Sequence, residues 1–551
     1  MVQRRQVFQL AGVAVAVGVG GTAWMYYGSR RSGAIANKPF SPYPMDPVAP
    51  ENFQKKLFVP VASGPFGVLD VASPLNIRAT AASFPLLPAK ESPFLLYQTE
   101  HAGKAFLNPI LRIESGTRFT ASLDNALTEP TIIHWHGLHT PATMDGHPVN
   151  TIAPGARYDY DFTVRNRGGT YWYHTHAHML TAKQAYNGLA SFFLVEDDDQ
   201  RKLAKALDLQ LGVTDLPLVI QDKQFDAQGR LRYQPNAHES MMGWLGDIIL
   251  ANLTPNAFQT VTPRTYRLRM LNGSNARIYR LAFMKGGTAL NFTVIGTDGG
   301  LIERPEIVTE AFLAPGERLD VLFDVGQAQP GDDIFLKSLA FDPMENEGSG
   351  GMGGMGGMNM NMGGGQMMGN MGSARLPLGM AFNVLKLSVV AGERVIAKPP
   401  ETLSQIKPIG IEGAPERKIE LSMGHMRFLI NGLTFRMDEI AFEVKRGAMV
   451  IWRISNPTVG MPHPMHLHGF SFQVIERLNS PPALAASARF GKGRTVSDLG
   501  WKDTVLVWPG ETVRIAIDFT HDFPGSQTYL FHCHNLEHED AGMMINYRVQ
   551  A

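Results

Sequence analysis

The stretch FHCHNLEHEDAGM, residues 531–543, contains the only cysteine of this 551-residue chain. Histidines flank Cys533 on both sides, His538 follows it by five residues and Met543 follows it by ten. One thiolate, imidazoles and a weak thioether are together the ligand set of a blue-copper electron-transfer site. The stretch therefore predicts a metal site close to the C-terminus.

The residues before Cys533 predict how its neighbours are oriented. Residues 528–531, TYLF, have the composition of a β-strand. Side chains alternate between the two faces of a strand, so His532 and His534 should point to one side and Cys533 to the other. We expect one metal on the cysteine side and others on the histidine side, joined by a short covalent path.

The composition favours a multidomain, turn-rich β protein. A chain of 551 residues exceeds one ordinary core, and its 56 glycines and 36 prolines favour many turns. Equal numbers of basic and acidic residues, 50 of each, give no support for nucleic-acid binding. A single cysteine excludes an internal disulfide framework, and no stable protein partner is indicated.

The N-terminus is typical of an export signal. Arg4 and Arg5 precede an apolar run from Leu10 to about Tyr27, and residues 34–36 are a candidate cleavage site. Paired arginines before an apolar run are typical of the twin-arginine route, which carries folded proteins. We therefore expect an exported, periplasmic protein with residues 1–36 as the signal. An uncleaved membrane anchor is the alternative, although the glycine-rich run is short for a spanning helix.

A Pro-Gly turn followed by an alternating strand recurs three times, at residues 153–162, 314–323 and 508–519. Repeats this far apart are typical of duplicated domains rather than of a solenoid. We therefore predict an all-β chain of three Greek-key β-sandwich domains after a proline-rich linker. The linker is placed at residues 37–69, and the domains at residues 70–200, 201–395 and 396–551.

The second domain is expected to contain a methionine- and glycine-rich insertion at residues 344–373. Its low-complexity part runs from Gly348 to Ser373 and has eight methionines. Such a segment cannot bury a core, so a mobile loop is expected. Strand-like segments at 333–337 and 380–387 indicate that it interrupts the second domain rather than joining two domains.

Three further histidine clusters repeat the pattern His-x-His. They are HWH at 134–136, HTH at 174–176 and HPMHLH at 463–468. An isolated His-x-His is usually incidental. On a strand, however, the two imidazoles share a face about 6.5–7 Å apart, a spacing that suits one metal or two adjacent ones. Together with residues 532–534, the pairs supply eight ligands, enough for a three-copper cluster.

The same alternation divides the third cluster. His466 and His468 share a face, and His463 points away from them if the strand is regular there, although Pro464 disturbs regularity. His463 is then free to join Cys533 and His538. With Met543 as a long axial ligand, these residues would form a His2Cys-plus-Met site beside the histidine cluster.

The motifs HWHG, YWYHTH, HPMHLHG and HCHNLEHEDAGMM resemble, in sequence and in order, the four copper motifs of the multicopper oxidase family. The resemblance covers most of residues 70–551. It implies three cupredoxin-like domains and an oxidase with four copper ions, of which one is type 1, one is type 2 and two are a type 3 pair.

The position of each residue in its motif implies a role. His134 and His466 would hold the type 2 ion. Cys533, His463, His538 and Met543 would form the type 1 site. The type 3 pair would be held by His136, His174, His176, His468, His532 and His534.

The resemblance also implies the reaction. A reductant gives single electrons to the type 1 ion, and they pass through Cys533 to His532 and His534 and on to the other three ions, where O2 is reduced to water. Protons must be supplied inside a buried site, so a carboxyl group is expected nearby. Glu539 resembles the proton-relay glutamate of the family. Asp145 resembles the acid near the type 2 ion, where relay and orientation of a histidine both stay open.

Only the methionine-rich insertion points to a substrate. Thioethers prefer Cu(I), so the insertion would gather cuprous ions for oxidation in copper tolerance, unless it is an insert without a role. We therefore expect a Cu(I) oxidase. A laccase-like oxidase of phenols and aromatic amines is the alternative. A non-enzymatic exported scaffold of the same fold is a third class, and the complete ligand set argues against it.

Other residues with ligand-type side chains are expected to be supporting ones. The stretch Trp501-Lys502-Asp503 also matches the family and is interpreted as structural. The remaining histidines, expected to be ordinary surface or supporting residues, are His101, His139, His147, His178, His238, His425 and His521.

Overall fold

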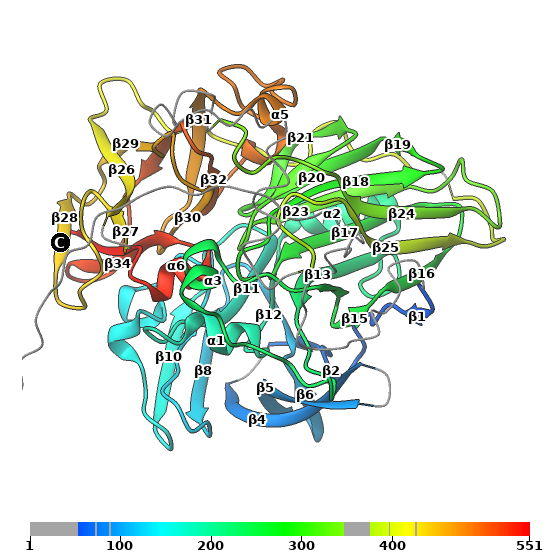
Figure 1. The fold of residues 1–551 in the computed structure, drawn as a ribbon, viewed down its shortest axis with the longest axis horizontal. Helices are drawn as coiled ribbons and strands as arrows, with labels where there is room; N and C mark the ends of the chain where they lie inside the picture. The colour runs from blue at the N-terminus through cyan, green and yellow to red at the C-terminus, as the bar shows by residue number, and fades with distance from the viewer. Residues whose placement is uncertain (1–52, 72–73, 88–89, 347–374, 396, 425–426) are drawn as a thin grey trace, which may run out of the picture. The chain divides into compact units, whose positions relative to one another are not determined.

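The alternating strands form three β-sandwiches, as the sequence predicts. The computed structural model describes residues 53–71, 74–87, 90–346, 375–395, 397–424 and 427–551 (Figure 1). All of these residues belong to one compact unit, residues 43–551. Each sandwich consists of two sheets whose inward side chains form a common core.

The first sandwich has sheets with the strand orders β10-β8-β4-β5-β6-β2 and β3-β7-β12-β11-β9. Leu123 of β8 and Phe193 of β12 lie in its core, one from each sheet. In chain order its elements are β2 (Gly64–Pro65), β3 (Val68–Asp70), β4 (Leu75–Leu87), β5 (Lys90–His101), β6 (Lys104–Leu107), β7 (Ile110–Glu114), β8 (Arg118–Asn125), β9 (Ile133–His134), η1 (Ala142–Met144), η2 (Pro148–Asn150), β10 (Arg157–Thr163), β11 (Gly169–Thr175), α1 (Thr181–Tyr186) and β12 (Ala190–Glu196). Helix α2 (Asp198–Leu207) follows and packs Leu203 and Leu207 into the core of the second sandwich.

The second sandwich has sheets with the orders β1-β16-β25-β24-β18-β19, with β22 on β18, and β15-β14-β13-β17-β23-β20-β21. Phe283 of β18 stacks on Phe323 of β23 across its core, with ring centroids 3.9 Å apart. Its elements are β1 (Lys55–Lys56), β13 (Asp215–Lys223), α3 (Ala237–Met242), β14 (Ile248–Ala251), β15 (Thr254–Pro255), β16 (Ala257–Val261), β17 (Thr265–Asn272), β18 (Tyr279–Lys285), β19 (Thr288–Leu290), β20 (Phe292–Thr297), β21 (Gly300–Val308), β22 (Ala311–Leu313), β23 (Arg318–Asp324), β24 (Asp333–Ser338) and β25 (Phe382–Val389).

The third sandwich has sheets with the orders β27-β26-β29-β33-β31 and β28-β35-β34-β30-β32. Trp452 of β29 packs edge-on against Phe531 of β34 between them. Its elements are β26 (Glu416–Gly424), β27 (Arg427–Ile430), β28 (Ile440–Val444), β29 (Met449–Ser455), β30 (His463–Leu467), β31 (Phe472–Leu478), α5 (Pro482–Ala485), η3 (Val496–Asp498), β32 (Thr504–Val507), β33 (Thr512–Asp518), β34 (Gln527–Cys533), α6 (Leu536–Asp540) and β35 (Met544–Val549).

Each Pro-Gly repeat forms the turn and strand that the sequence predicts, one in each sandwich. The repeats correspond to β10, β23 and β33. The turn glycines Gly155, Gly316 and Gly510 have φ values of 79°, 84° and 73°. Glycine adopts this left-handed region without the steric penalty that a Cβ would introduce. The repeat therefore preserves a turn geometry as well as a strand.

The strands on either side of the methionine-rich insertion are neighbours. β24 and β25 pair antiparallel, from Asp333 opposite Ser388 to Ser338 opposite Phe382. The chain therefore leaves and re-enters the second sandwich at adjacent strands, as expected for an insertion within that domain. Residues 347–374 themselves lie outside the described part.

Part of the stretch expected to be a linker is instead paired. β1 runs parallel to β16 of the second sandwich, while β2 and β3 join β6 and β7 of the first. Strands of two or three residues show no alternation that a sequence pattern can reveal, so the proline content was misleading here. The predicted signal, residues 1–36, lies outside the described part.

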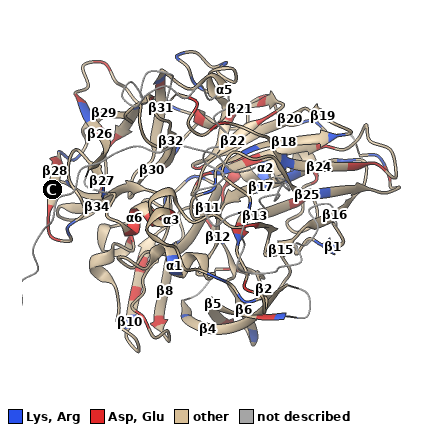
Figure 2. Ribbon diagram, viewed as in Figure 1, with Lys and Arg blue, Asp and Glu red and all other residues tan. Residues whose placement is uncertain are grey.

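Charges of both signs are distributed over the strands of all three sandwiches (Figure 2).

Helix α6 follows the strand that ends at Cys533 and contacts helices of the other two sandwiches. α6, drawn in red in Figure 1, contacts both α1 of the first sandwich and α3 of the second. Ala182 and Ala185 of α1 pack with Leu536 of α6 in one buried cluster. The cysteine region therefore lies where parts of all three sandwiches meet.

Candidate metal centre

Two pairs of strands bring the four His-x-His pairs together between the first and third sandwiches. His134 lies opposite His174 in the β9–β11 pair. His466 lies opposite His532 in the β30–β34 pair. The rings of His134 and His468 stack with centroids 3.8 Å apart, although they come from opposite ends of the chain. The pairs predicted from the sequence therefore form a single cluster.

Ring nitrogens of this histidine cluster face one another at short distances. The facing pairs are His134–His466 at 3.3 Å, His136–His174 at 3.4 Å, His176–His532 at 3.5 Å and His468–His532 at 2.9 Å. Three groups made of histidine alone offer one ligand nitrogen per ring within 4.8 Å of one another: His134–His136–His174, His134–His466–His468 and His176–His468–His532. Several metal ions therefore have converging nitrogen donors within this one cluster.

The other nitrogen of six of these rings is held by an oxygen acceptor. The contacts are His134 Nδ1 to the Asp145 carbonyl (2.6 Å), His136 Nε2 to Asp503 Oδ1 (3.0 Å), His174 Nδ1 to the Thr175 carbonyl (2.8 Å), His466 Nδ1 to the Asp503 carbonyl (2.9 Å), His468 Nδ1 to Asp145 Oδ2 (2.7 Å) and His532 Nδ1 to the Cys533 carbonyl (3.0 Å). An outer acceptor takes the N–H and leaves the inner nitrogen a lone pair for a metal.

His534 lies slightly apart from these groups. Its ring centroid is 5.0 Å from that of His136 and 5.4 Å from that of His174. Both of its ring nitrogens are buried and have no hydrogen-bond partner among the described residues, and the same holds for Nδ1 of His176. Buried polar atoms are rarely left without a partner, so these nitrogens fit metal ligands better than a structural role.

A second group of ligands lies on the other face of β34. Cys533 Sγ is 3.5 Å from His463 Nδ1 and 3.6 Å from His538 Nδ1, and the two nitrogens are 3.3 Å apart. Met543 is fully buried, and its carbonyl accepts the Cys533 N–H at 3.0 Å. His463 begins β30, a regular strand despite Pro464. The strand alternation therefore separates His463 from His466 as the sequence predicts.

Burial sets the protonation of the thiol and the imidazoles. Burial lowers the pKa of His174 and of His538 to about 3, so both rings are neutral at ordinary pH. Burial raises the pKa of the Cys533 thiol well above its ordinary value. A neutral imidazole is ready to bind a metal, whereas the thiol must lose its proton when the metal enters.

The two acids predicted from the resemblance both touch the histidine cluster. Asp145 accepts from His134 through its carbonyl and from His468 through its carboxylate. Glu539 Oε2 lies 3.2 Å from His532 Nδ1, and Oε1 lies 3.6 Å from His176 Nε2. Burial raises the pKa of both carboxyl groups well above the ordinary value.

Asp503, interpreted from the sequence as structural, is also in direct contact with the cluster. Its Oδ1 accepts from His136 and its carbonyl accepts from His466. Burial alone would raise the pKa of this carboxyl, but the Arg318 guanidinium and His136 lower it well below the ordinary value. The signal in the sequence was its place in a family motif, which gave no indication of what it touches.

The other histidines take no part in a metal group among the described residues. His147 is buried and His139 is half-buried. His147 Nε2 bonds to Asn546 Oδ1 at 2.8 Å, and His139 Nδ1 bonds to the Gly469 carbonyl at 2.5 Å. They are supporting residues, as expected. His425 lies outside the described part.

The donor sets fit copper. A single thiolate with two imidazoles and a nearby thioether suits an electron-transfer copper, and imidazole alone suits copper in other roles. The inward nitrogens are buried and turned toward one another. The arrangement therefore supports one-electron transfer at the sulfur group and multi-electron chemistry at the histidine cluster.

Comparisons with known proteins agree with this geometry. Models of the multicopper oxidase family match residues 98–200 and 411–551. McoA multicopper oxidase from Aquifex aeolicus is similar in structure, with a TM-score of 0.78 and 39% identity over 90% of this chain and 99% of that one. A laccase from Bacillus subtilis is 32% identical over 75% of this chain and 78% of its own length. A Campylobacter jejuni multicopper oxidase described as a metallo-oxidase has 25% identity and a TM-score of 0.69 over 91% of this chain and 97% of that one.

Gly146 tests how His134 is positioned. Its φ is 88°, and a Cβ there would lie 2.1 Å from the Ile133 carbonyl and 2.5 Å from the His134 Cα. We expect Gly146→Ala to displace His134 and to lower the copper content per chain, in addition to a strain of about 1–3 kcal/mol. Plasma mass spectrometry and thermal unfolding measure the two effects.

Gly155→Ala is the matched control for Gly146→Ala. Gly155 has a similar φ of 79°, but nothing lies within 4 Å of an added Cβ. It should show the strain and keep the full copper content. An equal loss of copper in both variants would contradict the proposed role of Gly146.

Proposed function

This chain belongs to the multicopper oxidase family, and we propose that it holds four copper ions in the two adjoining groups of ligands. As a member it is a copper-dependent oxidoreductase that takes electrons from a reductant and passes them to O2. Copper supplies one-electron transfer at the sulfur-containing site and the reduction of O2 to water at the histidine cluster. The side chains of the protein bind the ions, fix the orientation of the imidazoles and supply protons.

The ligand assignment follows the position of each residue in its family motif, and the two ligand groups of the structure support it. We assign Cys533, His463, His538 and Met543 to the type 1 ion, and His134 and His466 to the type 2 ion. The type 3 pair is assigned to His136, His174, His176, His468, His532 and His534. The observation that carries the assignment is the position of Cys533 in β34, with its sulfur in one ligand group and both sequence neighbours in the other.

We propose that Glu539 supplies protons to the histidine cluster. Its carboxyl lies within 3.2–3.6 Å of His532 and His176, and its raised pKa keeps a proton available there. Asp145 is held more firmly through one oxygen, since its Oδ2 accepts from His468 at 2.7 Å. Its Oδ1 has no hydrogen-bond partner among the described residues. Both orientation of His468 and proton supply are compatible with that geometry.

We propose Cu(I) as the reductant because both type 1 histidines are closed to bulky molecules. His538 is 0% and His463 is 4% exposed. The Nε2–H of His538 donates to the Met241 carbonyl of α3 at 2.9 Å, and its ring stacks on Phe428 with centroids 3.9 Å apart. A phenol has no bare imidazole edge to approach, whereas a metal ion needs only a small opening.

Methionines near the type 1 group and two similar proteins also bear on the substrate. Met241 and Met242 are half-buried on α3, and Met242 packs against the core that contains Cys533. The methionine-rich insertion would add more thioethers, although it lies outside the described residues. A metallo-oxidase among the similar structures supports the same substrate class. Similarity to a laccase favours phenols or aromatic amines as the alternative.

We also propose that the protein is exported to the periplasm. The support is the Arg4-Arg5 pair before an apolar run, in a segment outside the described part. Among the described residues, no helix combines the length and the apolar character needed to cross a bilayer. A retained N-terminal anchor is the alternative.

Replacing the sulfur tests the type 1 assignment. Cys533→Ser should abolish the blue absorption and reduce turnover to background, because a hydroxyl does not replace the thiolate. The copper content should fall by the type 1 ion alone. Visible absorption and copper analysis measure both, and a blue variant with near-native turnover would refute the assignment.

Replacing the proton source tests Glu539. Glu539→Gln should keep the blue absorption and the copper content but slow O2 consumption by about 100- to 10,000-fold, the usual contribution of a positioned acid. Asp145→Asn separates orientation of His468 from proton supply. The amide oxygen of asparagine still accepts from His468, but the amide has no acidic proton to give. Native turnover in Glu539→Gln would exclude the relay.

Deleting residues 348–373 tests the reductant. Cu(I) oxidation should fall far more than oxidation of a bulky phenol, because only the cuprous ion uses thioethers. Steady-state O2 consumption with each substrate measures the ratio. Equal losses, or none, would leave the cuprous oxidase proposal without support.

A further inference from the structure

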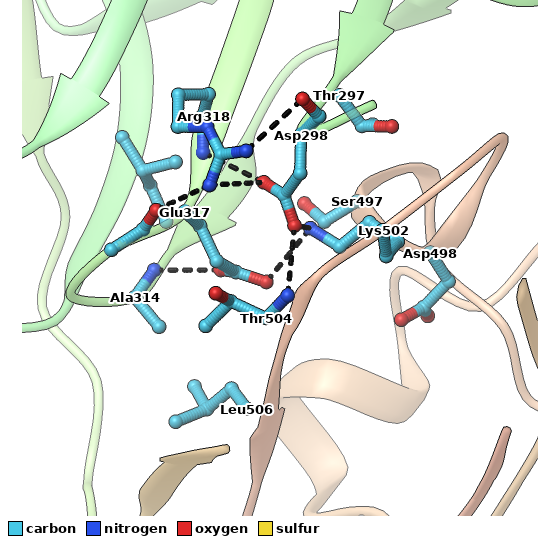
Figure 3. A network of polar contacts seen from close by, with 12 residues as sticks. Thr297, Asp298, Ala314, Glu317, Arg318, Ser497, Asp498, Lys502, Thr504 and Leu506 are labelled. Atoms are coloured by element: carbon cyan, nitrogen blue, oxygen red, sulfur yellow. Dashed lines mark hydrogen bonds and ion pairs between the residues drawn. The ribbon is translucent and has the colours of Figure 1, made fainter. Parts of the chain in front are cut away.

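The second sandwich carries none of the twelve assigned ligands, yet three of its charged residues reach the segment that supports the histidine cluster. Figure 3 shows Asp298 and Glu317 reaching Lys502, Asp298 reaching Thr504, and Arg318 joined to Asp298. All five side chains are buried. The network therefore joins two sandwiches at a point next to the assigned copper ligands.

Arg318, the first residue of β23, has each of its guanidinium nitrogens bonded. Nε donates to the Thr170 carbonyl at 3.0 Å, in the same strand as His174. Nη1 donates to the Gly316 carbonyl at 2.8 Å and to Asp503 Oδ1 at 2.9 Å. Nη2 donates to the Asp298 carbonyl and to Asp503 Oδ2. The guanidinium therefore grips both oxygens of Asp503, a geometry that fixes the plane of a carboxylate.

The backbone beside Asp503 is held by the other two acids. Lys502 Nζ lies 2.8 Å from Asp298 Oδ2 and 3.0 Å from Glu317 Oε1. Asp298 Oδ2 also accepts the Thr504 N–H at 3.2 Å. Asp298 Oδ1 accepts the Arg318 N–H at 2.8 Å. Contacts from the second sandwich therefore fix three successive residues, 502–504.

The opposite side of the same segment holds two histidines. Asp503 Oδ1 accepts from His136 Nε2 at 3.0 Å, and the Asp503 carbonyl accepts from His466 Nδ1 at 2.9 Å. His136 differs from the other rings in facing the cluster with Nδ1. Its carboxylate partner explains that choice, because an acceptor on Nε2 leaves the lone pair on Nδ1.

From these contacts we propose that Arg318 is a positioning residue of the oxygen-reducing site, acting through Asp503 to hold His136 with Nδ1 toward the copper ions. The proposal rests on the proposed copper assignment. The second sandwich then helps to orient one ligand of the histidine cluster, although it supplies none of the ligands itself. Without the guanidinium, Asp503 Oδ1 keeps only the Thr504 hydroxyl and His136 as side-chain partners, and Oδ2 loses its partner. The plane of the carboxylate is then less firmly fixed, and a His136 ring with its N–H on Nδ1 binds no metal.

Asp503→Asn reverses the polarity of one oxygen and tests the proposal directly. In either orientation the new NH2 meets an Arg318 donor, because Nη1 binds the Oδ1 position and Nη2 binds the Oδ2 position. The side chain must therefore leave its native plane, and where the NH2 faces His136 the ring must accept on Nε2 and carry its proton on Nδ1. We expect the blue absorption to persist, while the type 3 pair loses its near-ultraviolet absorption and the EPR-detectable fraction of the bound copper rises.

Arg318→Met tests the positioning role by itself. Asp503 keeps its charge and its contact with His136 but loses the guanidinium that binds both of its oxygens. The type 3 absorption should weaken while the blue absorption persists. A folded, blue Arg318→Met variant with native type 3 absorption would overturn the proposal.

Arg269→Met is the matched control for loss of a buried ion pair. Arg269 also lies in the second sandwich and binds both oxygens of a buried aspartate, Asp215, but it has no hydrogen bond to a histidine in the described part of the chain. It should lower thermal stability and leave the spectra of the bound copper native. A loss of the type 3 signal here as large as in Asp503→Asn would also overturn the proposal.

The native protein separates this inference from the proposed function. If copper-loaded native protein shows no blue absorption, or no near-ultraviolet absorption from a type 3 pair, the copper assignment itself fails. If the native spectra are normal and survive Asp503→Asn unchanged, only the role of Arg318 and Asp503 fails. Copper content, visible and near-ultraviolet absorption and EPR on the same samples decide between these outcomes.

Discussion

A buried imidazole with one nitrogen tied to a fixed oxygen is the interaction on which the rest of this structure depends. Six rings of the histidine cluster have that arrangement, with acceptors as different as the Thr175 carbonyl and the Asp145 carboxylate. The inner nitrogens then face one another, where hydrogen bonding among neutral rings cannot satisfy them all. Such an arrangement is costly unless a cation fills the centre, because buried polar atoms lose their water. The fold therefore prepares the cluster for metal before any metal enters.

The position of the cluster explains why three sandwiches are needed. Strands β9 and β11 come from the first sandwich and β30 and β34 from the third, so neither can form the cluster alone. The second sandwich acts from outside, through Arg318 toward the cluster and through α3 toward His538. Buried ion pairs add little net stability, but they enforce one arrangement of the parts they join. The network around Lys502 is suited to that purpose.

The two ligand groups differ in the residues that surround them. At the proposed type 1 group, Met241 and Phe428 cover His538, and our substrate proposal depends on that cover. At the histidine cluster, burial raises the pKa of Glu539 and Asp145, the two carboxyl groups for which we consider proton supply. Cys533 belongs to the first group and its two neighbours to the second. One strand therefore couples the two chemistries through a few covalent bonds.

The sequence alone determined the strand repeat, the all-β class and which side chains share a face. These are local properties, because alternation in a strand places His466 and His463 on opposite sides whatever surrounds them. The sequence did not reveal that Asp503 holds His136, that Arg318 holds Asp503, or that Met241 caps His538. Partners separated by 367 and 185 residues leave no periodic pattern. Only the packing of the sandwiches decided those contacts, since they depend on where each domain surface meets the next.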